Sequence, residues 1–388
     1  MKVFYAFGFI YLAAGAAVPQ HNHTSSRALY FLENNPAGSN IVSVKISSKD
    51  GTLSDPVRTS TKGAGLVGLN NLGEATVDTL FSQDSVVVSG SNLLTVNPGS
   101  NSVSLFTIPR HDPQHPKLIG APVPSGGDFP NTIAHLPRHN LTCVANSGAK
   151  SSVQCYTVTA SGLVPRGAPM PLPLANQTTP PMGPANTASD ILFNPSGSAL
   201  FVSIKGTGAA RQPGYLYAYA VSANGTVDPT PRVSRPAALG LDFSVSFLGR
   251  DDRAYVTDPG FGGAFVDIGC DLSVRVARVV NVTGNSAACW SQYSAEFGAV
   301  YSLDAGVADI TVLDPVSMDI KGTIAGPAAQ GGKFDSVVAG EFLYTLDGVA
   351  SITTYSLKEE RVVQTLNLTD FGARQFFQGM AFYDGSSW

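Results

Sequence analysis

The residues best suited to bind a ligand form an acidic and amide-rich set with no cation near them in the sequence. Each lies close to the start of an apolar, strand-like segment. The set contains Asp128, Asn131, Asn186, Asp190, Asp242, Gln292, Asp335 and Gln378. Carboxylate and amide oxygens suit the hydroxyl groups of a sugar and are the ligands of hard cations such as Ca²⁺. A bound carbohydrate or other small molecule, a divalent cation and a water-filled channel are all consistent with this set.

Acid-base chemistry has few candidates, because all six histidines precede residue 140. His135 is the candidate catalyst, although a single histidine in an apolar strand often has a structural role. His111 and His115 fall in a proline-rich stretch that we expect to be a surface loop, where a metal-binding pair is a weaker alternative. The sequence contains no Gly-x-Ser-x-Gly, His-Glu-x-x-His or Gly-x-x-x-x-Gly-Lys pattern.

The elements that must position these residues recur along the chain. A short apolar strand, often ending in Asn or Asp, appears seven times, at residues 29–34, 93–97, 141–146, 200–205, 254–258, 300–304 and 343–347. A turn and a second alternating strand follow each copy, which is typical of a hairpin. Second-strand centres at 42, 103, 153, 216, 265, 310 and 352 are 42 to 63 residues apart. A four-stranded propeller blade with loop insertions has this period.

The sequence therefore predicts an all-β, seven-bladed propeller. Residues 28–33 resemble the second strand of a blade, so blade one lacks its innermost strand. Residues 379–383 have the character of that missing strand, and their pairing with blade one would close the ring without an unpaired edge. An open β-sandwich or two separate domains are the alternatives.

Two segments carry a resemblance to a known family. The strand, Gly-Ser-Asn turn and strand of residues 93–108 and the phrase at residues 191–202 resemble lactonase-type propellers, which include carboxymuconate cyclases and 6-phosphogluconolactonases. The resemblance spans the mature chain and implies a lactonase or cycloisomerase ancestry. With an export signal and many glycosylation sequons, the chain is most similar to secreted fungal glycoproteins of the carboxymuconate cyclase-like branch.

The chain departs from that family where the resemblance places its catalytic groups. Family enzymes carry a Gly-Pro-Arg-His run before one strand and an Asn-Glu after it. This chain has Gly183-Pro184-Ala185-Asn186 at the first place, or Ser189-Asp190 if the gap is placed differently, and Ile204-Lys205 at the second. A proton-moving group and a cation that holds a carboxylate are thus missing from these positions. The departure favours a catalytically degenerate protein with a binding or cell-surface role.

A metal-dependent activity is the alternative that the resemblance leaves open. Metal-dependent lactonase propellers hold a divalent cation through Asn, Asp and Glu, and Asn131 and Asp242 occupy equivalent places here with Asn186 between them. A metal such as Ca²⁺ could polarise a lactone carbonyl and activate water. No glutamate stands at a matching place.

The first residues predict export. Lys2 precedes an apolar run over residues 3–14 and small residues to Ala17, the pattern of a signal peptide at residues 1–17. We then expect one propeller domain over residues 18–388, secreted to the extracellular space or the cell wall. Six sequons predict glycosylation at Asn22, Asn140, Asn176, Asn224, Asn281 and Asn367.

Four cysteines in an oxidising compartment predict disulfides. Cys143 and Cys155 are equally distant from Ala149, so a hairpin that turns there would place them opposite each other. We expect this pair and the pair Cys270–Cys289, with free buried thiols as the alternative.

Charge limits the partners. Only 13% of the residues are charged and the net charge is −4. Without a Lys/Arg cluster, neither nucleic acid nor an anionic membrane surface is expected as a partner. We also expect no membrane span and a monomer that takes a small molecule or carbohydrate in its central channel.

Overall fold

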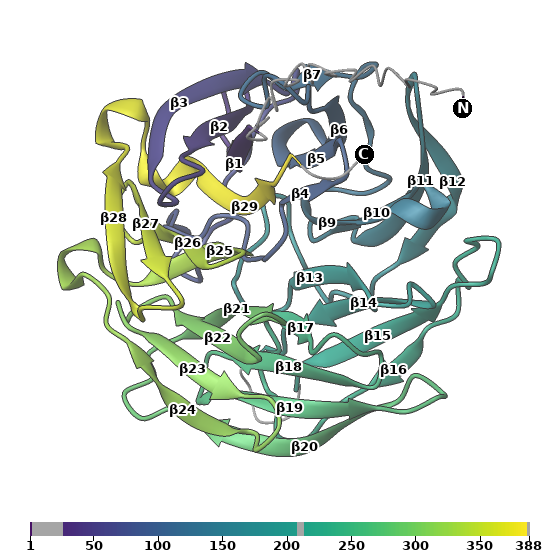
Figure 1. The fold of residues 1–388 in the computed structure, drawn as a ribbon. Coiled ribbons are helices and arrows are strands. Elements are labelled where there is room, and N and C mark those ends of the chain that lie inside the picture. Colours follow the sequence, from purple (N-terminus) through teal and green to yellow (C-terminus); the bar gives the residue numbers. More distant parts are fainter. Residues whose placement is uncertain (2–25, 208–212, 386–388) are drawn as a thin grey trace.

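Seven antiparallel sheets surround a central axis in the computed structural model, which describes residues 1, 26–207 and 213–385 (Figure 1). Apart from Met1, the expected signal peptide lies outside the described residues, as do Asn22 and the last three residues. Among the residues described, no helix has the length and apolar character that a membrane crossing would require.

Six blades are four-stranded sheets and blade two has five strands, and each runs outward from an innermost strand beside the axis. Blade one contains, in that order, β29 (Phe377–Tyr383), β1 (Arg27–Glu33), β2 (Asn40–Ile46) and β3 (Leu53–Ser60). Blade two contains β4 (Val86–Ser89), β5 (Asn92–Asn97), β6 (Ser102–Thr107) and β7 (Lys117–Leu118), and a fifth strand, β8 (Val123–Pro124), also pairs with β6. Blade three contains β9 (Pro130–Leu136), β10 (Leu141–Asn146), β11 (Ser152–Thr159) and β12 (Gly162–Pro171). Blade four contains β13 (Ala188–Phe193), β14 (Ala199–Ile204), β15 (Tyr215–Ala220) and β16 (Arg232–Ser234).

The last three blades follow the same order. Blade five contains β17 (Val245–Phe247), β18 (Arg253–Asp258), β19 (Gly262–Ile268) and β20 (Val274–Asn281). Blade six contains β21 (Ala288–Ser294), β22 (Ala299–Asp304), β23 (Ile310–Asp314) and β24 (Asp319–Ile324). Blade seven contains β25 (Lys333–Ala339), β26 (Phe342–Asp347), β27 (Ser351–Ser356) and β28 (Arg361–Asn367). Short 3-10 turns occupy Pro98–Ser100, Pro137–His139, Ala328–Gln330, Thr369–Phe371 and Arg374–Phe376.

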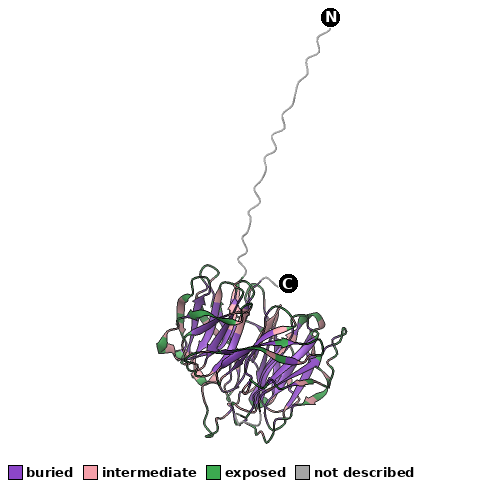
Figure 2. Cartoon of the chain, turned by 90° about the horizontal axis from the view of Figure 1, so that it is seen from below, coloured by how far each residue is buried: buried purple, intermediate pink, exposed green. Residues whose placement is uncertain are grey.

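Burial decreases from the second and third strands of each blade to its outer edge. In β22 all six residues are buried, whereas in β24 of the same blade only Ile324 is. Both faces of a middle strand lie against neighbouring blades, so these strands are apolar or small on both sides. Figure 2 shows the result, with buried strands inside and exposed residues concentrated in the loops.

The ring closes as predicted. The C-terminal strand β29 pairs with β1, with Ala28 opposite Tyr383 and Glu33 opposite Phe377. A β-bulge interrupts this ladder near Gly379, which adopts φ 67° and leaves no room for a Cβ beside Ser85 of blade two. The chain end thus supplies the inner strand that its beginning lacks.

One of the two predicted disulfides is formed. Cys143 and Cys155 are directly opposite in the β10–β11 hairpin and form a disulfide. The prediction of a Cys270–Cys289 disulfide was wrong, because both of these cysteines are free. Cys270 is exposed in the turn between β19 and β20 of blade five, whereas Cys289 is buried on the inner strand β21 of blade six, so the two lie on different parts of different blades.

Candidate functional site

A chain segment crosses the channel that the seven inner strands surround. Residues 78–85, here called the channel segment, belong to the long connection between β3 and β4. The backbone N–H of Gln83 donates to the carbonyl of Ser189 in blade four at 2.8 Å, and its side-chain Oε1 accepts from the N–H of Ser291 in blade six at 3.3 Å. No sequence pattern indicated this crossing, because the segment has no strand periodicity.

Asn131 ties the channel segment to blades three and four. Its amide nitrogen donates to the carbonyls of Leu80 at 3.1 Å and Ala188 at 2.7 Å, and its Oδ1 accepts from the hydroxyl of Ser147 at 3.0 Å. The residue is fully buried. Its amide therefore bonds to protein groups on both sides.

Four other predicted channel residues connect their inner strand to the next blade or to the chain segment between β3 and β4. Asp190 accepts from the N–H of Val245 (2.8 Å), Asp335 accepts from that of Gly379 (2.6 Å), Gln292 donates to the carbonyl of Ser336 (2.9 Å), and Gln378 donates to that of Val77 (2.9 Å). Burial raises the pKa of Asp190 and of Asp335 well above the usual range. The two carboxyl groups thus favour the neutral form.

Asp128 and Asn186 bond to loop groups, whereas Asp242 lies beside the inner strand of blade four, where its carbonyl accepts from the hydroxyl of Ser189 at 2.9 Å. Asp128 accepts from the N–H of Lys150 at 3.1 Å, and the amide of Asn186 donates to a loop carbonyl. Burial also raises the pKa of Asp242, which is fully buried. His135 contacts the hydroxyl of Thr142 at 2.8 Å through Nδ1, and burial lowers its pKa to about 4, so it is neutral at pH 7.

No metal site is evident in the part of the chain that the structure describes. Within it, no group of three or more histidine, cysteine, aspartate or glutamate side chains could hold a metal ion. The divalent cation expected at Asn131 and Asp242 stays a prediction.

A pocket opens at the face where the inner strands begin, and we call it the Lys205 pocket. It has a volume of about 430 Å³ and lies between the channel segment and blades four to seven. The side chains that matter for its chemistry are Asp78, Lys205, Phe243, Cys289, Trp290 and Phe334. Most of its other lining residues are apolar, so the pocket offers a largely water-excluding surface with few polar groups.

An aromatic wall forms one side of the Lys205 pocket. The ring of Trp290 lies 5.0 Å from that of Phe243 and 5.0 Å from that of Phe334, both at steep angles. The indole N–H of Trp290 donates to the carbonyl of Ser82 at 3.3 Å, which fixes the wall to the channel segment. Rings that are held in this way can receive a flat apolar ligand.

Lys205 brings a single amine against this wall. It is 2% exposed, and its Nζ donates to the carbonyl of Phe81 at 2.5 Å and lies 4.4 Å from the ring centre of Phe243. Burial lowers the pKa of Lys205 to about 7, and the nearby carboxylate of Asp78 opposes this shift. Burial likewise raises the pKa of Asp78 to about 6.

The blade repeat shows where Lys205 stands. It follows the last residue of β14, Ile204, which corresponds to Asp258 at the end of β18. Asp258 accepts hydrogen bonds from Gly240 and Leu241 and so fixes the loop that leads into blade five, whereas Ile204 has no side chain for this purpose. The backbone N–H of Lys205 donates to the carbonyl of Thr187 at 3.1 Å, which leaves the lysine side chain free of this loop.

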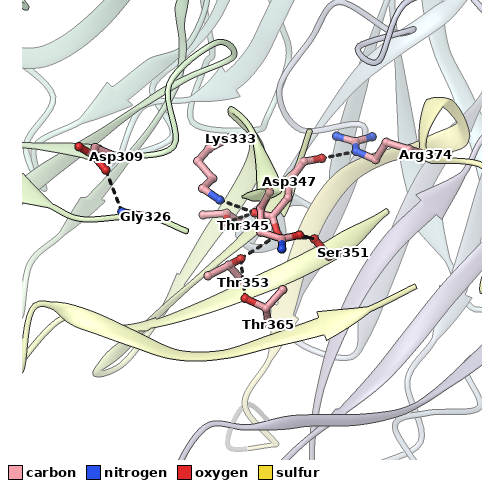
Figure 3. A network of polar contacts seen from close by, with 10 residues as sticks. Asp309, Gly326, Lys333, Thr345, Asp347, Ser351, Thr353, Thr365 and Arg374 are labelled. Carbon is pink, nitrogen blue, oxygen red and sulfur yellow. Dashed lines mark hydrogen bonds and ion pairs between the residues drawn. The ribbon is translucent and has the colours of Figure 1, made fainter. Parts of the chain in front are cut away.

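A buried polar network lies at the strand that carries Phe334, and Figure 3 shows its members Lys333, Asp347 and Arg374. Lys333 and Asp347 form an ion pair of 2.7 Å with both side chains fully buried. The guanidinium of Arg374 donates to the backbone carbonyl of Asp347 and to that of Phe377, and it lies 5.0 Å from the ring centre of Phe334. The network thus holds this part of the aromatic wall in place.

Sequence reasoning missed the Lys205 pocket, although one signal for it was present. The strand copy at residues 200–205 ends in Lys where six other copies end in Asn or Asp. For Asp78, Trp290 and Phe334 no sequence signal existed, since they meet only when the ring closes.

The comparisons agree with the fold. No known protein-family model and no curated protein sequence matches the chain. Among solved structures, the chain is similar to the periplasmic gluconolactonase of Pseudomonas aeruginosa (TM-score 0.65, 14% identity, 92% of this chain and 99% of that one). It is also similar to a candidate 6-phosphogluconolactonase from Bacteroides fragilis (TM-score 0.64, 11% identity, 94% of this chain and 100% of that one). A protein from Lactobacillus plantarum is similar to the same extent (TM-score 0.64, 14% identity, 92% of this chain and 99% of that one). At such identities the similarity establishes a lactonase-like propeller fold alone.

Proposed function

We propose that this chain is an exported, catalytically degenerate binding protein that holds a small aromatic or otherwise apolar compound in the Lys205 pocket. The ligand carries one oxygen acceptor that faces the amine of Lys205. This proposal moves the ligand from the channel itself, where a small molecule or carbohydrate was expected, to one mouth of the channel.

The observation that carries the proposal is the pairing of an aromatic wall with one buried amine. A volume of about 430 Å³ lies in the range of small-molecule sites, roughly 300 to 1,000 Å³. Trp290, Phe243 and Phe334 supply the apolar area, and Lys205 supplies the polar contact that fixes orientation. Sugars would leave most of their hydroxyl groups unpaired on such a surface, which disfavours them.

Export and glycosylation belong to the same proposal, as does membership of the secreted fungal branch. Five of the six sequon asparagines lie in the described residues, and all five are exposed: Asn140, Asn176, Asn224, Asn281 and Asn367. Their exposure supports glycosylation because an attached glycan must face solvent.

Tryptophan fluorescence tests the proposal. The chain has two tryptophans, so a Trp388→Phe background leaves Trp290 in the pocket as the only tryptophan, which is excited selectively over the tyrosines. Benzyl alcohol and benzoate should quench it saturably, whereas glucose should not. Phe334→Ala should weaken binding about tenfold through lost ring contact, and the exposed Val316→Ala should leave it unchanged.

Two results would overturn the proposal. One is the absence of saturable quenching by any apolar probe. The other is hydrolysis of a lactone such as gluconolactone, with or without Ca²⁺, at a rate that Lys205→Met or Asp78→Asn abolishes, because the pocket would then be catalytic.

A further inference from the structure

Two nucleophilic side chains line the Lys205 pocket, and burial acts on them in opposite directions. The neutral amine of a lysine and the thiolate of a cysteine are the reactive forms. Burial lowers the pKa of Lys205 to about 7 and raises the pKa of the Cys289 thiol, so near pH 7 the lysine gains its reactive form and the cysteine loses it. The amine is therefore the nucleophile of this pocket.

The surroundings of the amine leave it able to react. Its hydrogen bond to the Phe81 carbonyl uses one N–H, and among the described residues it forms no ion pair with a carboxylate. Its position 4.4 Å from the ring centre of Phe243 places it beside the surface on which a ligand ring would lie. The walls around the amine are mostly apolar, and Lys205 itself is 2% exposed, so few polar groups compete with a ligand for it.

We propose that Lys205 captures an aromatic aldehyde as a Schiff base. The inference rests on the proposed function, because it names the ligand class of the same pocket. The Nζ lone pair forms a bond to the carbonyl carbon, and the carbonyl π pair moves to oxygen, which takes up a proton while nitrogen releases one. The resulting hydroxyl takes up a proton and leaves as water while the nitrogen lone pair forms the C=N bond, and the nitrogen then releases its remaining proton. One aldehyde and one amine thus give one imine and one water, with no net gain or loss of protons.

Asp78 is suited to move the proton that this exchange requires. It lines the same cavity, and its negative charge favours the protonated form of Lys205. Burial raises the pKa of Asp78 to about 6, so near neutral pH both its acid and its base forms are populated. The carboxyl is fixed by the N–H of Phe81, which donates to Oδ1 at 2.8 Å. Asp78 is thus the group that would pass a proton to the departing hydroxyl.

Reductive trapping tests the inference on the full-length protein. The protein is incubated at pH 7 with an equimolar amount of benzaldehyde and cyanoborohydride, and peptide mass spectrometry locates the added benzyl group. We expect Lys205 to be labelled at least tenfold faster than any other lysine. Cys289→Ser should retain the labelling, and Asp78→Asn should slow it at least fivefold.

Two variants, Lys205→Met and Lys205→Arg, are compared so that the test does not depend on one variant that fails to fold. Both should lose the label, and Lys205→Arg should still bind benzyl alcohol, which cannot form an imine. Binding of benzyl alcohol without preferential labelling of Lys205 in the unmodified protein would refute the Schiff base and leave the proposed function standing. Absence of both binding and labelling would refute both.

Discussion

Replacing Lys205 with methionine should change how the stability of the protein depends on pH. The side chain is almost fully buried, and burial lowers its pKa from an ordinary 10.5 to about 7. Between pH 7 and pH 9 the unfolded chain keeps this amine protonated while the folded chain releases the proton. Because the unfolded state binds more protons in that window, the folded state gains stability as the pH rises.

The size of the effect follows from the shift. Two pH units at about 1.4 kcal/mol each give about 3 kcal/mol that the unmodified protein gains between pH 7 and pH 9. Methionine does not titrate, so the free energy of unfolding of Lys205→Met relative to the unmodified protein should fall by about 3 kcal/mol from pH 6 to pH 9. Loss of the cation also raises the pKa of Asp78 further, which acts in the same direction.

Urea denaturation at pH 6 and pH 9 measures this difference. Lys321→Met on β24 is the matched control, because Lys321 is exposed and its substitution should have the same effect at both pH values. A difference for Lys205→Met that stays constant within about 0.5 kcal/mol would refute the claim that the amine is neutral in the folded protein at pH 9.

Three further predictions concern the scaffold. Replacing both Cys143 and Cys155 with alanine should lower the free energy of unfolding by about 3 kcal/mol, because the disulfide removes chain entropy from the unfolded state. Cys270→Ala, at an exposed free thiol, should change it little in the same denaturation assay. Asn131→Ala should cost about 3 kcal/mol in urea denaturation through three lost buried hydrogen bonds, and unchanged stability would contradict its structural role. Asp347→Asn should cost about 3 to 5 kcal/mol in thermal or chemical denaturation, because it leaves a buried lysine without its counter-charge.

The blades could be predicted from sequence because nearly all of their strands pair with strands that are close in the sequence. Alternation of buried and exposed residues, hairpin turns and a regular period all act over a few dozen residues. The hairpin disulfide Cys143–Cys155 was predictable for the same reason, since both cysteines belong to one turn. The pair Cys270–Cys289 failed because the positions of two residues in different blades depend on the whole ring.

The candidate site was harder to predict because the type of a residue does not tell which groups its side chain contacts. Asn131, Asp190 and Asp335 stand near the starts of inner strands as expected, yet their contacts join strand to strand or to the channel segment. The crossing of the channel by residues 78–85 depends on long-range contacts and leaves no periodic trace. Lys205 ends a sequence copy where the six others end in Asn or Asp, but the strand pairing places Ile204 at that position, so the repeat pointed only to the neighbourhood of the lysine.

A crystal structure of the protein soaked with benzyl alcohol tests the central claim most directly. We expect electron density for the ring against Trp290 and Phe334, with the hydroxyl oxygen within hydrogen-bond distance of Lys205 Nζ. Density for the compound elsewhere on the molecule, with this pocket holding only ordered water, would contradict the assignment of a ligand site to the Lys205 pocket.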